Sequence, residues 1–491
     1  MKRLLVILLL LAMCLSVLAS CNKQKGGDKN SQTSQEGEAG NEASDAVIPL
    51  PEANPEWSGR EFSIIYRDSY DYEWVFDETM AGSVINDSIY KRNKAVEDRY
   101  DITFAPISTP NVSFESDFLQ PIQIAVSSGE DAYQLAAGME YRLASVSAYG
   151  EFLNWYQIPN LDLTAAWWDG DFAETSAYNG STYVMTGSLS LSHLYSSSCV
   201  FFNQDMVNSV IENGAETIYQ KVWDGTWTLD AFYEYVQQFT ADNGDDVWDA
   251  TDTYGYATNV NTGVDAFIFC SEIPLSKRDA DGEITLIPPT EKLINLANKL
   301  NLIINTSGNT FIQDAASKEI DPHIGMMLRE KAVFTTSYLK KASELRETNI
   351  NYGILPYPKW DEAQTEYHSI TMDFSSAFAV PRSVEDQEFV GAVLEAMAYY
   401  SYDYVRDALY SSVLKYRDAK DENSSKCIDI ILENPQYDFA YIYAFSWGDQ
   451  QGPSALLRTC IKAAKPYIAN AYKSSETRFN TTLTEFLGNF K

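Results

Sequence analysis

From Arg60 onward the chain alternates between short apolar runs and segments of helical periodicity, and this alternation restricts the possible folds more than any other feature. The runs 62–66, 101–104 and 133–137 are typical of buried strands. Between them, 85–100 and 118–126 carry apolar residues at helical spacing. A succession of strand, helix and strand predicts an α/β fold, in which helices cover a parallel sheet.

The same alternation continues through the rest of the chain. Strands are expected at 199–202, 332–335, 352–355 and 376–380, and helices at 229–236, 290–304 and 386–410. A length of 491 residues implies more than one folded unit. No repeat of fixed period is found.

The charge and composition exclude several classes of function. The formal net charge is −33, which argues against a nucleic-acid partner because the chain would repel phosphates. Only three histidines are present, too few for most histidine-rich zinc sites. Aromatic residues make up 13% of the chain, with 32 Tyr and 10 Trp, and such side chains suit the recognition of a partly apolar small molecule.

The N-terminus has the pattern of a secretory signal. Lys2 and Arg3 precede the apolar run 4–15, which is short for a permanent membrane span. Leu18-Ala-Ser-Cys21 then resembles the lipobox of bacterial lipoproteins. The resemblance implies a signal peptide at 1–20, a lipid on Cys21, and an extracytoplasmic protein anchored to the bacterial cell membrane. The alternative is an ordinary cleavage site with an incidental cysteine.

The segment after Cys21 is predicted to be a flexible tether. Residues 22–46 contain no aromatic residue and no aliphatic side chain larger than alanine, so they cannot bury enough surface to fold. The tether is expected to span 21–57. No later segment has eighteen consecutive apolar residues.

Four cysteines remain beyond the tether, and buried thiols are favoured over disulfides for them: Cys199, Cys270, Cys427 and Cys460.

Two motifs in the middle of the chain resemble a known family. They are Cys199-Val-Phe-Phe-Asn-Gln-Asp-Met206 and Gly225-Thr-Trp-Thr-Leu-Asp230. Glu330-Lys-Ala-Val-Phe-Thr-Thr-Ser-Tyr338 and Tyr352-Gly-Ile-Leu-Pro-Tyr-Pro-Lys359 follow in the same order. Together they are similar to the family 1 extracellular solute-binding proteins of ABC importers, the group that includes maltose-binding protein.

The resemblance implies a two-lobed fold of the maltose-binding-protein type, with the lobes joined by hinge strands. Lobe 1 is expected to hold 58–200 and 351–412, and lobe 2 to hold 201–350 and 413–491. Such a protein would act as a monomer, bind a small polar solute between its lobes, and deliver it to the transmembrane subunits of an ABC permease.

Candidate ligand-binding residues follow from the rule that ligands of α/β sheets lie beyond the carboxyl ends of strands. Flat aromatic rings would pack against the C–H face of a sugar, and carboxylates and amides would bind its hydroxyl groups. Phe445 is a further candidate for an aromatic wall from lobe 2, although core packing is the competing interpretation of every single ring. The predicted ligand-binding residues are Arg67, Asp68, Glu140, Tyr141, Trp168, Ser188, Tyr338, Asp373, Ser375 and Trp447.

The function predicted from the sequence is therefore binding without catalysis, with a sugar or oligosaccharide as the first choice of ligand. A secreted carbohydrate-active hydrolase is the main alternative, although neither a GxSxG nucleophile elbow nor an HExxH motif occurs. A non-sugar ligand also remains open, as does a chemosensing or adhesive role on the same scaffold.

One acidic loop partly matches a calcium site. In Asn243-Gly-Asp-Asp-Val-Trp-Asp249-Ala-Thr-Asp252 the candidate ligands are Asn243, Asp245, Asp249 and Asp252. Ala241 stands at the first ligand position, and Asp246 replaces the glycine of the turn. A solvated acidic loop is the favoured interpretation, bound calcium is the alternative, and no other cofactor is expected.

Overall fold

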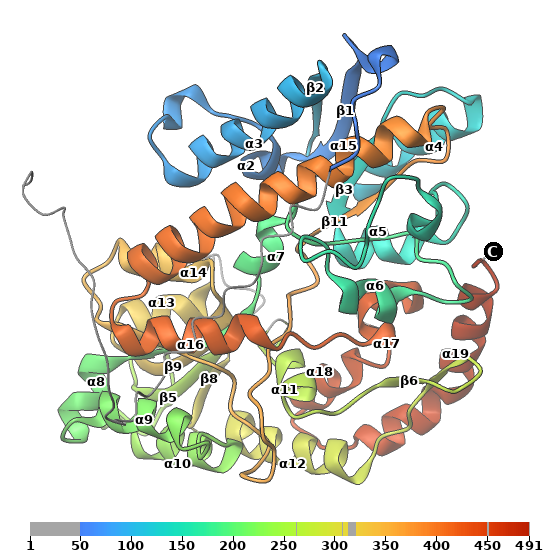
Figure 1. Ribbon diagram of the computed structural model, residues 1–491. Coiled ribbons are helices and arrows are strands. Elements are labelled where there is room, and N and C mark those ends of the chain that lie inside the picture. Colours follow the sequence, from blue (N-terminus) through green and yellow to red (C-terminus); the bar gives the residue numbers. More distant parts are fainter. Residues whose placement is uncertain (1–49, 262, 307, 313–320, 449–450, 491) are drawn as a thin grey trace, which may run out of the picture. The chain divides into compact units, whose positions relative to one another are not determined.

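The computed structural model describes residues 50–261, 263–306, 308–312, 321–448 and 451–490, which pack as one compact unit (Figure 1). The predicted signal peptide, the lipidation site at Cys21 and most of the predicted tether lie outside the described residues. Among the helices in the described ranges, none is both long and apolar enough to cross a bilayer.

The first lobe is built on a four-stranded sheet of order β11-β3-β1-β2. Strand β1 pairs in parallel with both β2 and β3, which confirms the predicted parallel sheet. The fourth strand, β11, is antiparallel to β3. Helices α3 and α15 cover one face of the sheet, and α4 and α5 the other. The bounds are β1 Glu61–Arg67, α2 Asp71–Trp74, α3 Val84–Tyr100, β2 Thr103–Thr109, α4 Gln120–Ser128, β3 Leu135–Met139, α5 Glu140–Ser147, α6 Gly170–Ser176, α7 Leu191–Tyr195, β11 Ser376–Ala379 and α15 Gln387–Tyr400.

The second lobe is built on a five-stranded sheet of order β10-β4-β9-β5-β8. Strands β5, β8 and β9 are parallel, whereas β4 is antiparallel to both β9 and β10. Helices α9 and α10 cover one face, and α13, α14 and α16 the other. The bounds are β4 Ser198–Asn203, α8 Gln204–Val210, α9 Gly214–Trp223, α10 Leu229–Gln238, β5 Tyr254–Thr258, β8 Thr310–Ile312, α13 Pro322–Leu328, β9 Ala332–Tyr338, α14 Lys341–Arg346, β10 Tyr352–Leu355 and α16 Glu422–Glu433.

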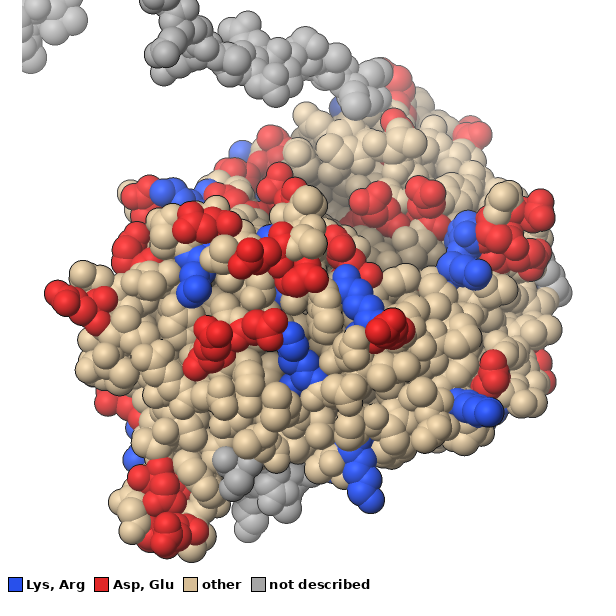
Figure 2. All heavy atoms as spheres, turned by 90° about the horizontal axis from the view of Figure 1, so that it is seen from below, with Lys and Arg blue, Asp and Glu red and all other residues tan. Residues whose placement is uncertain are grey.

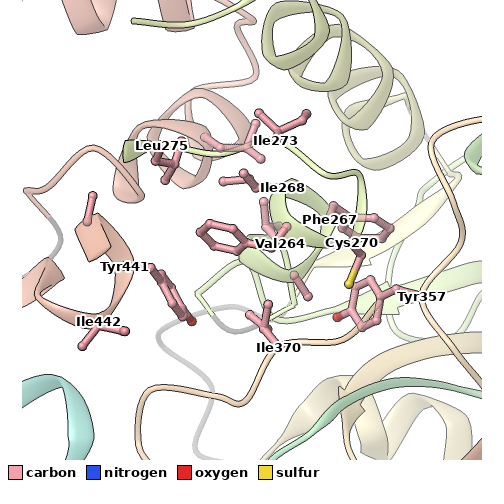
Figure 3. Close-up of a cluster of buried hydrophobic side chains, with 14 of the residues drawn as sticks. Val264, Phe267, Ile268, Cys270, Ile273, Leu275, Tyr357, Ile370, Tyr441 and Ile442 are labelled. Atoms are coloured by element: carbon pink, nitrogen blue, oxygen red, sulfur yellow. The ribbon is translucent and has the colours of Figure 1, made fainter. Parts of the chain in front are cut away.

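The last helices pack against both lobes; in the first lobe, the Ser176 carbonyl accepts a hydrogen bond from the Tyr443 hydroxyl at 2.8 Å. Figure 3 shows side chains of α11 and α17 facing one core, in which Tyr357 lies beside Cys270. The rings of Phe267 and Tyr357 are 4.8 Å apart, and those of Phe269 and Tyr441 are 4.9 Å apart. The bounds in this region are α11 Asp265–Cys270, β6 Ser276–Arg278, β7 Ile284–Leu286, α12 Glu291–Asn305, α17 Phe439–Ile442, α18 Ala455–Lys462 and α19 Ile468–Leu487.

Three segments connect the two lobes. Two of them, 196–198 and 370–372, run antiparallel: the Ser198 amide donates to the Ile370 carbonyl at 2.9 Å, and Ser197 forms a bridge with Thr371. The third is the helix predicted at 386–410. It continues beyond α15 through two segments with π-type turns, Ser401–Arg406 and Ala408–Asp418, whose apolar side chains join the core beside α14 and α16.

Two predicted boundaries are wrong. The folded unit begins at Leu50 and not at residue 58, because the Trp57 ring packs against the rings of Tyr100 and Phe389, both with centroids 5.7 Å away. The predicted return to lobe 1 at residue 351 is also too early. Strand β10 pairs with β4 in the second sheet, and the chain crosses back only at 370–372.

The strand and helix positions predicted near the sheets are otherwise close to those observed. Thr228 caps α10 as expected, its hydroxyl accepting a hydrogen bond from the Ala231 amide. The four cysteines that the sequence predicts to be thiols are free and buried.

On the face in Figure 2, Lys and Arg side chains lie apart from one another among more numerous Asp and Glu side chains.

Candidate functional site

A cavity of about 220 Å³ lies where the two lobes meet, and we call it the polar cavity. Tyr141 belongs to α5, directly after β3, and Asp373 and Phe374 lie two to three residues before β11. Asn261 follows β5 of the second sheet. The cavity therefore lies at the strand ends of both sheets, where an α/β fold places its ligands. Its lining is Tyr141, Asn261, Asp373, Phe374, Ala444, Phe445, Gly448, Gly452, Ser454, Ala455 and Arg458.

Backbone hydrogen bonds fix the first-lobe wall of the cavity. The Tyr141 amide donates to the Asp373 carbonyl at 3.0 Å, and the Glu140 amide donates to the Ser375 carbonyl at 2.9 Å. The Ser375 hydroxyl in turn donates to Glu140 Oε2 at 3.0 Å. Burial raises the pKa of the Glu140 carboxyl to about 7. Glu140 and Ser375 thus hold the wall in place, while Tyr141 and Asp373 line it.

Aromatic rings from both lobes face one another at the cavity. Tyr141 meets Phe445 edge to face, with ring centroids 5.5 Å apart. The Arg142 guanidinium lies 4.9 Å from the centre of the Phe445 ring. Phe374 packs against Tyr338 of β9, with centroids 5.0 Å apart, so Tyr338 contacts the lining without being part of it. Such rings offer apolar surface to the C–H face of a sugar.

The other end of the cavity is charged. Arg458 Nε lies 3.1 Å from Asp265 Oδ1, and both side chains are nearly buried. Burial raises the pKa of Asp265 to about 7 although the Arg458 charge opposes the shift. Lys462 donates to Asn261 Oδ1 at 2.6 Å. This end therefore presents a guanidinium and an amide, which are hydrogen-bonding groups suited to sugar hydroxyls.

Two predicted residues at the end of β1 lie outside the cavity. Arg67 is buried, and its Nε donates to Asn111 Oδ1 at 2.8 Å. Asp68 is exposed. Neither residue is part of the lining of the polar cavity, so a role in ligand binding stays a prediction for both.

Three other predicted residues are not brought to the polar cavity. Trp168 and Ser188 line a different cavity of about 320 Å³ beside the two antiparallel segments that connect the lobes, together with His193 and Thr371. The Trp168 indole N–H donates to Glu395 Oε2 at 2.8 Å. Trp447 is 4% exposed and donates to the Phe479 carbonyl, so its ring is part of the core.

The sequence did not predict Arg458 or Asn261. Arg458 lies on α18, far along the chain from any sheet strand, and no local pattern indicates that this helix returns to the strand ends. Asn261 follows β5 closely enough for the strand-end rule to have indicated it. Phe445 was expected as an aromatic wall from lobe 2, and it lines the cavity.

The acidic loop brings together a different set of carboxylates from the one predicted. Asp245 and Asp252 lie with Asp242, their carboxylate oxygens all within 4.8 Å of one another. Asp249 instead accepts hydrogen bonds from the Thr251 amide and hydroxyl, both at 2.7 Å. If calcium binds, these three aspartates could hold it; its presence stays a prediction.

Comparison with known proteins gives a match in structure only. Neither a scan against protein-family models nor a search of curated proteins finds a match. Among solved structures, the GacH receptor of Streptomyces glaucescens, solved unliganded and with acarbose or an acarbose homolog, is similar with a TM-score of 0.54 and 11% identity, covering 87% of this chain and 99% of its own.

Two further solved structures have the same fold. The galacto-N-biose/lacto-N-biose I-binding protein of Bifidobacterium longum, in complex with lacto-N-biose, has a TM-score of 0.54 at 14% identity and covers 87% of this chain and 97% of its own. An ABC substrate-binding protein of Listeria monocytogenes, in complex with cycloalternan, has a TM-score of 0.53 at 11% identity and covers 87% of this chain and 100% of its own. The chain therefore has the two-lobed fold of the family 1 extracellular solute-binding proteins of ABC transporters.

Proposed function

We propose that this protein is the substrate-binding lipoprotein of an ABC importer and captures a sugar or oligosaccharide between its lobes. The lipid on Cys21 and the tether after it would hold the folded unit outside the cytoplasmic membrane. The transmembrane permease subunits would receive the loaded protein. No bond of the ligand would be made or broken.

The observation that carries this proposal is the composition of the polar cavity. Rings from both lobes, Tyr141 and Phe445, face each other there, and Arg458 and Asp373 supply polar groups beside them. This combination matches a pyranose, which has an apolar C–H face and a rim of hydroxyl groups. The related folds that were solved with acarbose, lacto-N-biose and cycloalternan support a saccharide as the first choice.

The proposed mechanism is hinge closure. The antiparallel segments 196–198 and 370–372 connect the sheets through few residues, so changes in their backbone angles can move one lobe against the other. A ligand that contacts both Tyr141 and Arg458 would favour the closed form because only that form offers both contacts.

Binding of saccharides to the purified protein tests the proposal. A thermal-shift screen of mono- and oligosaccharides should give at least one that raises Tm, because a ligand that binds only the native state stabilises it. In the same assay Phe445→Ala should weaken binding by about 2 kcal/mol, or some thirtyfold. Tyr416→Ala is the control, since Tyr416 is 90% exposed and outside the cavity lining.

The same samples distinguish a binding protein from a hydrolase. Chromatography of the saccharide after incubation should recover it unchanged. The appearance of shorter products would support the hydrolase alternative. If no saccharide changes Tm while a solute of another class raises it, the sugar ligand is rejected.

A further inference from the structure

A second and larger cavity, of about 770 Å³, lies between the lobes, and we call it the Tyr72 cavity. This volume falls within the range of about 300–1,000 Å³ that is usual for small-molecule sites, whereas the polar cavity is smaller than that range. Its lining is Tyr66, Asp71, Tyr72, Val75, Phe76, Asp77, Glu78, Met80, Ser83, Ile85, Asn86, Ser108, Tyr195, Lys340, Ser343 and Arg417.

The Tyr72 cavity lies at the same edge of the sheets as the polar cavity. Tyr66 of β1 pairs with Ser108 of β2, and each residue is the last but one of its strand. On the opposite side, Lys340 and Ser343 follow the end of β9 in the second lobe. The segment 68–83, between β1 and α3, supplies most of the first-lobe wall. Both cavities therefore open at strand ends, one beside β2 and the other beside β3 and β11.

A small group of aromatic residues separates the two cavities. Tyr70 donates its hydroxyl to the Phe374 carbonyl, and the Phe374 ring packs against Tyr338 at 5.0 Å. Phe374 lines the polar cavity, and Tyr338 is two residues before Lys340, which lines the Tyr72 cavity. A ligand that occupies both cavities would pass between Phe374 and Tyr338 and replace their contact with its own contacts to each ring.

The walls of the two cavities differ in chemistry. Aromatic and alkyl side chains supply most of the surface of the Tyr72 cavity. Met80 is 54% exposed, and the rings of Tyr72 and Tyr195 lie 6.3 Å apart. Lys340 places its ammonium 4.5 Å from the centre of the Tyr72 ring. An apolar ring would find packing surface here, and a cation beside it.

We propose that the Tyr72 cavity binds the apolar aglycone of a glycoside, an aryl or alkyl group, whose sugar occupies the polar cavity. This inference rests on the proposed function, because it assigns the sugar to the polar cavity. It adds a substrate class to that function: saccharides linked to an apolar group, in preference to free sugars of the same composition.

Matched pairs of glycosides provide the test. The probes are 4-nitrophenyl and methyl glycosides of the same sugars, in both anomers, measured by titration calorimetry with the intact protein. For at least one sugar, the nitrophenyl glycoside should bind at least tenfold more tightly than the methyl glycoside. Equal affinity within every pair that binds would overturn the inference and leave the proposed function intact. No binding of any glycoside would count against both.

Variants of the cavity wall locate the extra affinity. Met80→Ala removes an exposed apolar side chain from the wall of the Tyr72 cavity, and Ser343→Trp fills the cavity with a large ring. Each variant should reduce the preference for the nitrophenyl glycoside at least threefold. Neither should change the affinity for the methyl glycoside. Leu302→Ala is the control, because Leu302 is 47% exposed on α12 and outside both cavities. If both variants keep the full preference for the nitrophenyl glycoside, the nitrophenyl ring binds outside the Tyr72 cavity and the proposed aglycone site is rejected.

Discussion

Glu140 connects β3 to β11 through a carboxyl group that the fold buries, and this has a consequence for stability. Burial raises the pKa of Glu140 to about 7 in the folded protein, whereas a glutamate in an unfolded chain has a pKa of 4.5. The folded state therefore binds more protons between these values, so the free energy of unfolding falls as the pH rises from 4.5 to 7.

Glu140→Gln should remove this dependence because glutamine stays neutral. Relative to the native protein, the variant should gain stability between pH 5 and pH 8, by about 1–3 kcal/mol. Thermal denaturation at several pH values, followed by circular dichroism, measures the change. Asp77→Asn is the control: hydrogen bonds from Thr79 lower the pKa of Asp77 below 3.8, so its effect should be flat over this interval. A difference for Glu140→Gln that is equally flat would contradict the assignment.

At the scale of single residues, the strand-end rule predicted that Tyr141 and Asp373 bind ligand; the structure brings both to the lining of one cavity, and ligand binding stays a prediction for them. It could not predict Arg458, because a helix that is remote in sequence brings that side chain to the site. It also could not separate wall residues from core residues. Trp168 and Trp447 each use the indole N–H in a buried hydrogen bond, and this depends on partners that are far away in the chain.

At the scale of elements, the segment before β1 is part of the first lobe. Trp57 ends a short helical turn, Pro55–Trp57, and is 4% exposed, while Leu50 and Pro51 accept hydrogen bonds from Arg99 and Tyr100 of α3. These contacts fix residues that the sequence predicted to belong to a flexible tether.

Trp57→Ala should therefore destabilise the protein by about 3–5 kcal/mol, the usual cost of removing a buried large aromatic side chain. Denaturation by urea, followed by circular dichroism, measures the loss. Trp223→Ala is the matched control, because Trp223 is 36% exposed on α9. A loss for Trp57→Ala no greater than that of the control would mean that the segment is dispensable, as the tether prediction assumed.

The individual elements were predictable, whereas their partners were not. Buried strands such as β1 and β4 are short and mostly apolar runs, which local sequence reveals. Strand β10 is such a run too, but its pairing with β4 joins residues about 150 positions apart, and no local signal records it. The resemblance to the binding-protein family predicted the two-lobed arrangement. It placed the return of the chain from the second lobe to the first at residue 351, about twenty residues before the observed segment 370–372.

At the scale of the whole folded unit, contacts between the lobes hold the described conformation. Tyr338 comes from β9 of the second lobe and Phe374 from the segment before β11 of the first, and their rings are 5.0 Å apart. Tyr72 and Lys340 form a second contact of this kind. The proposed hinge motion would break both contacts, so they would bias the ligand-free protein toward the closed form.

Tyr338→Ala should shift that balance toward an open form. An aromatic pair contributes about 0.5–1.5 kcal/mol beyond its buried area, so the ratio of closed to open protein should fall roughly two- to tenfold. Small-angle X-ray scattering should show a larger radius of gyration for the ligand-free variant than for the native protein. With saturating saccharide the two radii should agree, because the ligand restores closure. Tyr399→Ala is the matched control, since Tyr399 forms a comparable ring pair with Trp167, with centroids 5.2 Å apart, inside the first lobe. If both variants expand equally, or neither does, the Tyr338–Phe374 contact does not govern closure, and other contacts between the lobes, such as that of Tyr141 with Phe445, hold the described conformation.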